Sequence, residues 1–127
     1  MKLNIKIRIE KNSPRRTENG YQYVLEAFGD DGRKIQKVSE RDTFEGNAYE
    51  TGVFALLQAC RRIRRNQMME VVIYSNCEQL TASVYQMKGW VKSGWTRSRG
   101  RKISLRDEWE EIADILSRKM VTALPLK

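Results

Sequence analysis

The sequence predicts an α/β fold, with one mixed β-sheet and helices on its faces. Residues 2–10 alternate strictly between apolar and polar side chains, which is typical of a strand with one buried face. Residues 49–63 instead repeat apolar side chains at helical spacing. Residues 71–74 read Val-Val-Ile-Tyr, an apolar run expected of a strand in a sheet that is covered on both faces. Together the patterns indicate antiparallel and helix-linked strands in one sheet.

The N-terminal third predicts an antiparallel meander of three strands. The first is residues 2–10, and residues 11–20 follow as a loop because they contain turn formers and no aliphatic or aromatic side chain. Residues 21–28 are rich in aromatic and aliphatic side chains and predict the second strand. Gly29-Asp30-Asp31-Gly32 has the composition of a hairpin turn, so residues 33–39 form the third strand.

Helices and strands alternate in the remainder of the chain. The patterns predict a helix over 47–65, a strand over 70–75, a helix over 77–85, a helix after 104 and a strand over 121–124. Asn47 suits the N-cap of the first helix. Ser104, with Asp107 three residues later, suits an acidic variant of the capping box for the last helix. The complete prediction is a single domain over residues 1–127 with a five-stranded sheet, three antiparallel strands plus two helix-linked strands.

The composition favours a polyanionic partner. A chain of 127 residues with 40% hydrophobic and 31% charged residues has room for one globular core. Its 24 basic and 16 acidic residues give a net charge of +8, which favours nucleic acid through steering and counterion release. No apolar run is long enough for a membrane span and no signal-peptide pattern begins the chain, so we expect a cytoplasmic protein without a membrane partner.

Missing residue types exclude several chemistries. The sequence contains no histidine, which removes His-dependent nucleophiles and His-ligated zinc. Its cysteines, Cys60 and Cys77, have no metal-ligand spacing and imply no disulfide framework.

A basic segment, residues 86–103, carries most of the functional signal. There is no acidic residue between Gln79 and Arg106. Lys and Arg neutralise phosphates, and indole rings pack against sugars or bases. The residues expected to contact nucleic acid are Lys88, Trp90, Lys92, Trp95, Arg97, Arg99, Arg101 and Lys102. An alternative is that Trp90 or Trp95 packs as a small core beneath this segment. Trp109 is expected to be a core residue of the last helix.

A second basic cluster, Arg61-Arg62-Ile63-Arg64-Arg65, ends the first predicted helix. Cations at a helix C-terminus interact favourably with its dipole. A solvated helix end therefore explains this cluster as well as contact with nucleic acid does.

The order of several short motifs resembles the ribonuclease H family over essentially the whole chain. The motifs are Glu10 ending the first strand, Gly20-Tyr21, Asn47-Ala48-Tyr49-Glu50 opening a helix, Ile73-Tyr74-Ser75-Asn76-Cys77-Glu78, the basic segment with its tryptophans, and Asp107-Glu108-Trp109. The resemblance implies an RNase H-like fold in which residues 86–103 form the basic handle that grips a hybrid.

The resemblance also implies an incomplete metal site. Family enzymes hold two magnesium ions with four carboxylates, and the matching catalytic positions here are Glu10, Glu50 and Asn76. Glu10 replaces an aspartate and Asn76 offers only one weak acceptor oxygen. We expect the helix that carries the fourth carboxylate to be missing, since the sequence ends at Leu126-Lys127. Glu10 and Glu50 are then weak metal ligands at best, because Mg²⁺ gives up water reluctantly.

We therefore expect a nucleic-acid-binding RNase H-like domain without efficient nuclease activity. Its partner would be RNA–DNA hybrid or duplex, with Asn47 near the minor groove by analogy with the family, and binding would need no cofactor. Two alternatives stay open. One is an active, Mg²⁺- or Mn²⁺-dependent ribonuclease H. The other is a protein-interaction subunit of a nucleic-acid-processing complex, as a homodimer or with another protein.

Overall fold

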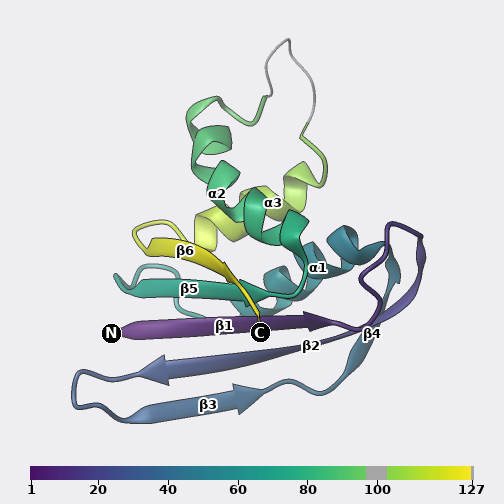
Figure 1. Cartoon of the computed structure of the whole chain (residues 1–127). Helices are drawn as coiled ribbons and strands as arrows, with labels where there is room; N and C mark the ends of the chain where they lie inside the picture. Colours follow the sequence, from purple (N-terminus) through teal and green to yellow (C-terminus); the bar gives the residue numbers. More distant parts are fainter. Residues whose placement is uncertain (97–102, 127) are drawn as a thin grey trace.

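The computed structural model describes residues 1–96 and 103–126 as a sheet covered by helices (Figure 1). Its elements in chain order are β1 (Lys2–Ile9), β2 (Thr17–Phe28), β3 (Lys34–Val38), β4 (Asp42–Gly46), α1 (Ala48–Cys60), β5 (Glu70–Ser75), α2 (Glu78–Lys92), α3 (Arg106–Ile115) and β6 (Met120–Pro125). The strand order is β3-β2-β1-β5-β6, and β4 pairs with the first part of β2. β1, β5 and β6 run parallel, whereas β2 is antiparallel to β1, β3 and β4.

The described helices all lie on one side of the sheet (Figure 1). α1 packs on β1 and β2, α2 packs on β5 and β6, and α3 packs on the other two helices. The alternation in β1 explains this arrangement, because Ile5, Ile7 and Ile9 are buried beneath the helices while Lys6 and Arg8 point the other way. We call this other side, which carries Lys6, Arg8 and the residues paired with them, the open face.

Three predictions are corrected by the structure. The sheet has six strands instead of five in the described chain, because Asp42–Gly46 pairs with β2 as β4. The run of apolar residues in β5 predicted cover on both faces, but the described helices cover one face only. Ser104 does not cap α3: the N-cap is Leu105, which has a φ of 58° and makes no side-chain capping bond.

The core is built from the helix side of the sheet and the helices above it. Trp109 of α3 is fully buried there, as predicted, beside Leu56 of α1 and Ile73 of β5 in the same hydrophobic cluster. Burying side chains of this size is the main favourable term in folding. None of the described helices is long and apolar enough to cross a membrane.

Close packing of α1 on β1 depends on the absence of a side chain at Gly52. A Cβ atom at Gly52 would lie 3.0 Å from Cδ1 of Ile9 and 3.2 Å from Cδ2 of Leu80. Both of these side chains are buried, so neither has room to move away.

We expect Gly52→Ala to lower the free energy of unfolding by about 1–2 kcal/mol, because overpacking outweighs the gain in helix propensity. Gly89→Ala is the matched control. Gly89 lies in α2, and a Cβ atom there would meet nothing within 4 Å. Gly89→Ala should raise the free energy of unfolding by about 0.5–1 kcal/mol. Urea denaturation measures both, and equal effects of the two substitutions would contradict this account of the packing.

Candidate functional site

The parallel strands β1 and β5 end at the same edge of the sheet, and two predicted site residues directly follow them. Glu10 comes after β1 and Asn76 comes after β5. Ligands of α/β sheets commonly bind outside the carboxyl ends of the strands. The candidate site therefore consists of these two loops and the neighbouring N-terminus of α1, which carries Asn47 and Glu50.

Asn76 joins the two strands through its side-chain amide. Its Nδ2 donates to the carbonyl oxygen of Ile9 at 2.8 Å, and its Oδ1 accepts from the Ile9 backbone N–H at 3.0 Å. The pair extends the β1–β5 ladder beyond the last aligned residues, Ile7 and Ser75. The Asn76 carbonyl accepts from Nδ2 of Asn12 at 2.8 Å. An amide suits this position because a carboxylate could not donate to Ile9.

A second amide, that of Asn19, binds the backbone on the other side of Glu10. Its Oδ1 accepts from the Lys11 N–H and its Nδ2 donates to the Lys11 carbonyl, both at 2.9 Å. Asn19 is fully buried. Asn19 was not predicted as a site residue because it lies in a stretch with loop composition, although β2 already begins at Thr17. The two asparagines therefore fix the backbone that precedes and follows Glu10.

Glu10 points to the open face of the sheet. Its N–H donates to the Gly20 carbonyl at 2.9 Å, and its carboxylate occupies the place where a Gly20 Cβ would stand. The next residue, Tyr21, points to the helix side, where its ring meets that of Phe54 at 5.8 Å. The Arg41 guanidinium binds both carboxylate oxygens, with Nη2 at 2.9 Å from Oε1. This hydrogen bonding by Arg41 holds the pKa of Glu10 below its ordinary value.

Glu50 lies on the helix side and completes a capping box at the start of α1. Its N–H donates to Oδ1 of Asn47 at 2.8 Å, and its Oε1 accepts from the Asn47 N–H at 3.0 Å. The predicted N-cap is thus confirmed. The other carboxylate oxygen, Oε2, is paired with Arg16. The Ala48 N–H donates to the Ser13 carbonyl at 2.9 Å, so the loop before β2 also covers this helix end.

The structure does not bring Glu10 and Glu50 together. The residue at the end of β1 that faces α1 is Ile9, which lies against Gly52, while Glu10 projects on the opposite side of the sheet. In the part of the chain that the structure describes, no three His, Cys, Asp or Glu side chains cluster in a way that could hold a metal ion. The donors present do not fit a pair of Mg²⁺ ions, which need several hard anionic oxygens around them.

Two adjoining hollows flank the N-terminus of α1. Glu50 lines one and Asn76 lines the other, and the two hollows share Asn47, Tyr49 and Gln79. The Tyr49 hydroxyl accepts from Nε1 of Trp109 at 3.0 Å and lies 3.0 Å from Oγ of Ser83. This chain of hydrogen bonds ties α1 to α2 and α3, so the position of Asn47 and Glu50 is coupled to α2, which carries the first part of the basic segment, and to α3, which follows that segment.

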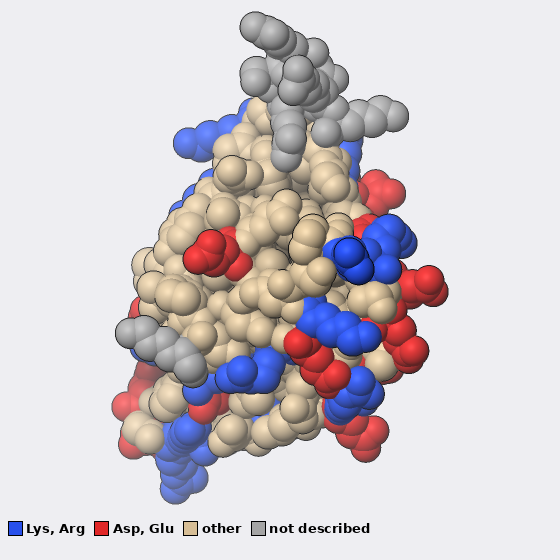
Figure 2. Space-filling model, turned by 45° about the vertical axis from the view of Figure 1, so that its right-hand side comes forward, with Lys and Arg blue, Asp and Glu red and all other residues tan. Residues whose placement is uncertain are grey.

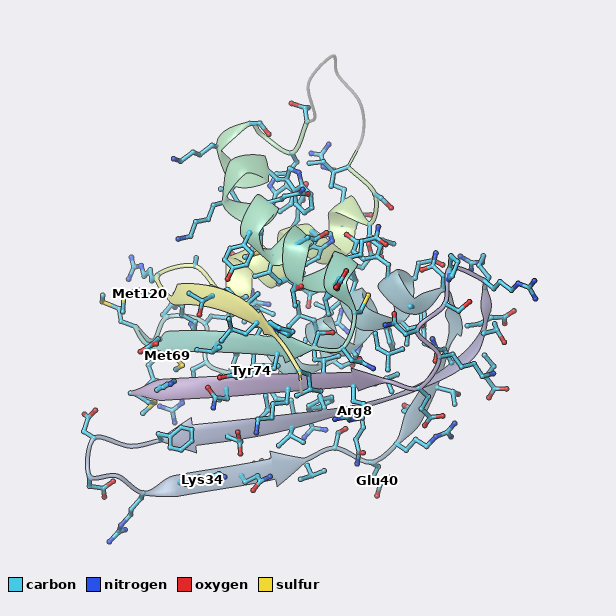
Figure 3. The ribbon with its side chains drawn as sticks, viewed as in Figure 1. Arg8, Lys34, Glu40, Met69, Tyr74 and Met120 are labelled. Carbon is cyan, nitrogen blue, oxygen red and sulfur yellow. The ribbon has the colours of Figure 1, made fainter. Side chains whose placement is uncertain are left out.

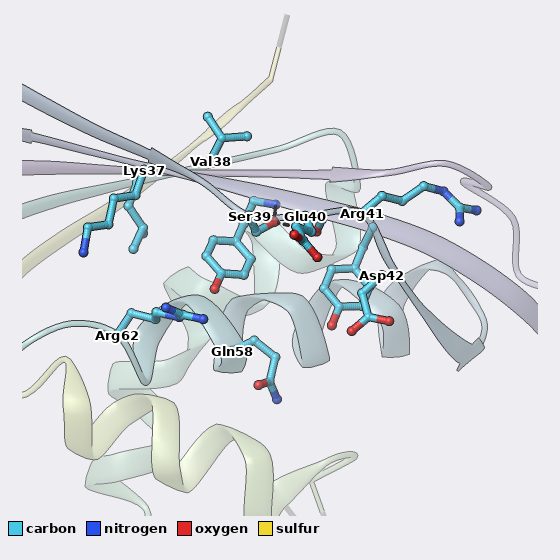
Figure 4. Close-up of a pocket in the computed structure, with 11 residues that line it drawn as sticks. Lys37, Val38, Ser39, Glu40, Arg41, Asp42, Gln58 and Arg62 are labelled. Atoms are coloured by element: carbon cyan, nitrogen blue, oxygen red, sulfur yellow. Dashed lines mark hydrogen bonds between the residues drawn. The ribbon is translucent and has the colours of Figure 1, made fainter.

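A larger cleft of about 700 Å³ lies between β3 and α1 (Figure 4). Lys37 of β3 lines it, together with Gln58 of α1 and Arg62, which follows α1. The adjacent arginines have structural partners: Arg61 binds Glu111 at 2.6 and 3.0 Å, and Arg65 pairs with Asp114. These two members of the second basic cluster therefore tie the end of α1 to α3.

The predicted nucleic-acid contacts divide into surface and core residues. Lys88 and Lys92 are exposed on α2 and make no ion pair with another described residue. Trp90 is only 8% exposed, with its ring centroid 5.7 Å from that of Trp109 and 6.4 Å from that of Trp95. Trp90 is thus a core residue, which corrects its assignment as a nucleic-acid contact, because α2 continues to Lys92 and turns this side chain inward. Trp95 remains half-exposed.

The rest of the predicted handle is only partly described. Arg97, Arg99, Arg101 and Lys102 lie outside the described residues. On the face shown in Figure 2, basic and acidic side chains alternate along the lower right, as paired charges do, while the central surface is largely uncharged.

We expect Asn76→Asp to lower the free energy of unfolding by about 1–3 kcal/mol, because the Ile9 carbonyl loses its donor and faces a carboxylate. Asn66→Asp makes the same chemical change at an exposed residue whose side chain has no hydrogen bond to another described residue. Its effect should stay within about 0.5 kcal/mol. Guanidinium denaturation at neutral pH compares the two, and an unchanged stability of Asn76→Asp would argue against the structural role of the amide.

The comparison with solved structures identifies the fold. No protein-family model matches the sequence, and no curated protein matches it. LC9-RNase H1, a type 1 RNase H with the type 2 active-site motif, matches with a TM-score of 0.71 and 12% identity over 99% of this chain. The foamy viral protease–reverse transcriptase in complex with an RNA/DNA hybrid matches with a TM-score of 0.69 and 16% identity over 97% of this chain. RNase H1 of Halobacterium salinarum matches with a TM-score of 0.61 and 13% identity over 98% of this chain.

The length covered differs between these structures. The chain spans 63% of LC9-RNase H1, 17% of the foamy viral protein and 86% of the Halobacterium enzyme. At this level of identity the matches establish architecture, which fold analogy alone does not convert into activity. The chain therefore has the RNase H-like fold that its motifs predicted.

Proposed function

We propose that this chain is a nucleic-acid-binding domain that holds RNA–DNA hybrid or duplex without cleaving it efficiently. The observation that carries the proposal is that each position matching a family acid is already engaged within the protein. Arg41 binds Glu10, Arg16 binds Glu50, and the Asn76 amide binds the Ile9 backbone.

These contacts oppose two-metal hydrolysis for an electrostatic reason. Two-metal catalysis requires paired divalent ions about 3.5–4 Å apart, held by negative oxygens that also orient the scissile phosphate. Here a guanidinium neutralises each of the two carboxylates, and the third position carries no charge. A loss of about 3–4 kcal/mol of transition-state stabilisation already lowers a rate by several hundred-fold. Binding of nucleic acid needs no such ions, so no cofactor is required for it.

Phosphate binding is assigned to the basic segment. Lys88 and Lys92 present unpaired charge at the end of α2, and four more cations follow within the next ten residues of the sequence: Arg97, Arg99, Arg101 and Lys102. Such contacts position a duplex without reading its sequence. Half-exposed Trp95 is available for packing on a sugar or base, and Asn47 lies between the two hollows beside α1.

The similar structures support the class of partner and also keep one alternative open. The foamy viral protein was solved in complex with an RNA/DNA hybrid. The matches to RNase H enzymes, together with retention of Glu50 at the start of α1, favour an active Mg²⁺- or Mn²⁺-dependent ribonuclease H as the second candidate. A cytoplasmic location, and a homodimer or other protein partner, remain predictions from the sequence.

Hybrid binding should depend on salt and on the lysines of α2. We expect Lys88→Gln/Lys92→Gln to weaken binding at low salt and to reduce the slope of log K against log salt by about 2, since each lysine contacts one phosphate. Lys2→Gln/Lys37→Gln removes the same charge from exposed positions in β1 and β3 and should leave the slope unchanged. Fluorescence anisotropy with a labelled hybrid gives both quantities. Binding without a salt slope, or equal losses in both double variants, would count against the proposal.

A cleavage assay separates the proposal from the ribonuclease alternative. Glu50→Gln removes a carboxylate yet preserves the fold, because Gln also completes a capping box at this position. With Mg²⁺ or Mn²⁺ and a labelled RNA–DNA hybrid, we expect purified wild type and Glu50→Gln to show the same background rate. Metal-dependent cleavage by the wild type that Glu50→Gln abolishes would establish the alternative instead, even if the binding measurements agree with the proposal.

A further inference from the structure

The open face carries apolar and cationic side chains in two adjacent regions. Tyr74, Met120 and Leu124 belong to β5 and β6, and Met120 is 70% and Leu124 46% exposed. Arg8 and Lys34 lie on β1 and β3, on the other side of β5 in the strand order (Figure 3). Singly exposed apolar residues are ordinary, but a group beside a charged rim is typical of an interaction surface.

The cationic region keeps an excess of positive charge. Glu26 is only 4% exposed and is bound by Lys6 at 2.9 Å and Lys34 at 2.8 Å. Hydrogen bonds from these two lysines lower the pKa of Glu26 to about 2, so it remains a carboxylate over the whole physiological range. The single carboxylate of Glu26 is therefore shared by two lysines. Arg8, two residues after Lys6 on the same face, is exposed and makes no ion pair with another described residue.

A buried acceptor lies between the two regions. Asn4 is 9% exposed, and its Oδ1 is the one shielded side-chain nitrogen or oxygen without a hydrogen-bond partner among the described residues. Asn4 lines a hollow of about 490 Å³ together with Lys6, Tyr74 and Leu124. A buried acceptor without a donor is costly, so the hollow suits a ligand group that brings an N–H or O–H.

We propose that the open face docks an acidic amphipathic helix of a protein partner. The apolar stripe of such a helix covers Tyr74 and Leu124, its carboxylates face Arg8 and Lys34, and a polar side chain at the boundary donates to Oδ1 of Asn4. A sheet face buries an amphipathic helix well, since each element has one apolar side to hide. This surface lies across the sheet from α2, so it is separate from the lysines assigned to nucleic acid.

Other occupants fit the same surface less well. A second copy packed face to face would place two positive regions against each other. If a nucleic-acid duplex bound here, the exposed apolar side chains of Leu124 and Met120 would face phosphates and water and would not be buried. Strand addition at β6 is opposed by Tyr85, whose hydroxyl donates to the Ala123 carbonyl at 2.6 Å and accepts from the Ala123 N–H at 3.2 Å. These are backbone groups that an added strand would need.

Synthetic peptides test the proposal on the full chain. The probes are three labelled peptides of equal length: an amphipathic helix with a leucine stripe and glutamates, the same helix with lysines in place of the glutamates, and a scrambled version of the acidic peptide. Fluorescence anisotropy should show the acidic helix binding at least about tenfold more tightly than either control, with an affinity that falls as salt rises. Equal affinities for the three peptides would overturn the proposal.

Variants of the protein then locate the peptide. Arg8→Glu and Leu124→Glu should each weaken binding of the acidic helix by about tenfold. Val91→Glu is the control, because Val91 is 52% exposed, close to the 46% of Leu124, and lies on α2. Circular dichroism checks that each variant folds. If Leu124→Glu unfolds, Arg8→Glu still tests the surface, because Arg8 is exposed and its substitution should not disturb the fold. An effect of Val91→Glu equal to theirs, or competition of hybrid with the peptide, would contradict the assignment.

Discussion

The pairing of the Asn76 amide with the Ile9 backbone determines the geometry of the candidate site. It continues the contact between β1 and β5 after the regular ladder has ended, and Asn19 holds Lys11 in the same way on the other side of Glu10. The strand direction is thus maintained through Glu10. Since alternate residues of an extended chain point to opposite faces, Ile9 faces α1 and Glu10 faces away. The Asn76 side chain, at the position that the family resemblance assigns to a third acid, thereby has a structural role.

Each of the carboxylates of Glu10 and Glu50 is bound by an arginine of the same chain. Arg41 and Arg16 come from segments far from their partners in sequence, and each binds a carboxylate that the family resemblance assigns to metal. Guanidinium groups are permanently charged and match carboxylate geometry, so Arg41 and Arg16 bind these two carboxylates without any bound ion. Exposed pairs of this kind add little stability. In the proposed function these pairs act by neutralising the negative oxygens that would attract Mg²⁺.

Much of the fold was predictable because its signals are local. The alternation of β1, the apolar run of β5 and the Asn47 cap depend on neighbouring residues and were recognised from them. Strand β4 was missed because its five residues, Asp-Thr-Phe-Glu-Gly, lack a clear alternation and are ordered by pairing with β2. Trp90 was misassigned because the predicted helix ended at residue 85, whereas α2 continues to Lys92. The partners of Glu10 and Glu50 lie 31 and 34 residues away, and no local pattern indicates them.

The most direct test of this account is a titration of the isotope-labelled protein with Mn²⁺, followed by two-dimensional NMR of the backbone amides. Mn²⁺ takes the same oxygen ligands as Mg²⁺ and broadens signals of nearby nuclei. If the arginines occupy both carboxylates, we expect no selective broadening around Glu10, Glu50 or Asn76, and the same response in Glu50→Gln. Selective loss of those signals at substoichiometric Mn²⁺, restored by Glu50→Gln, would show instead that the carboxylates hold a divalent ion.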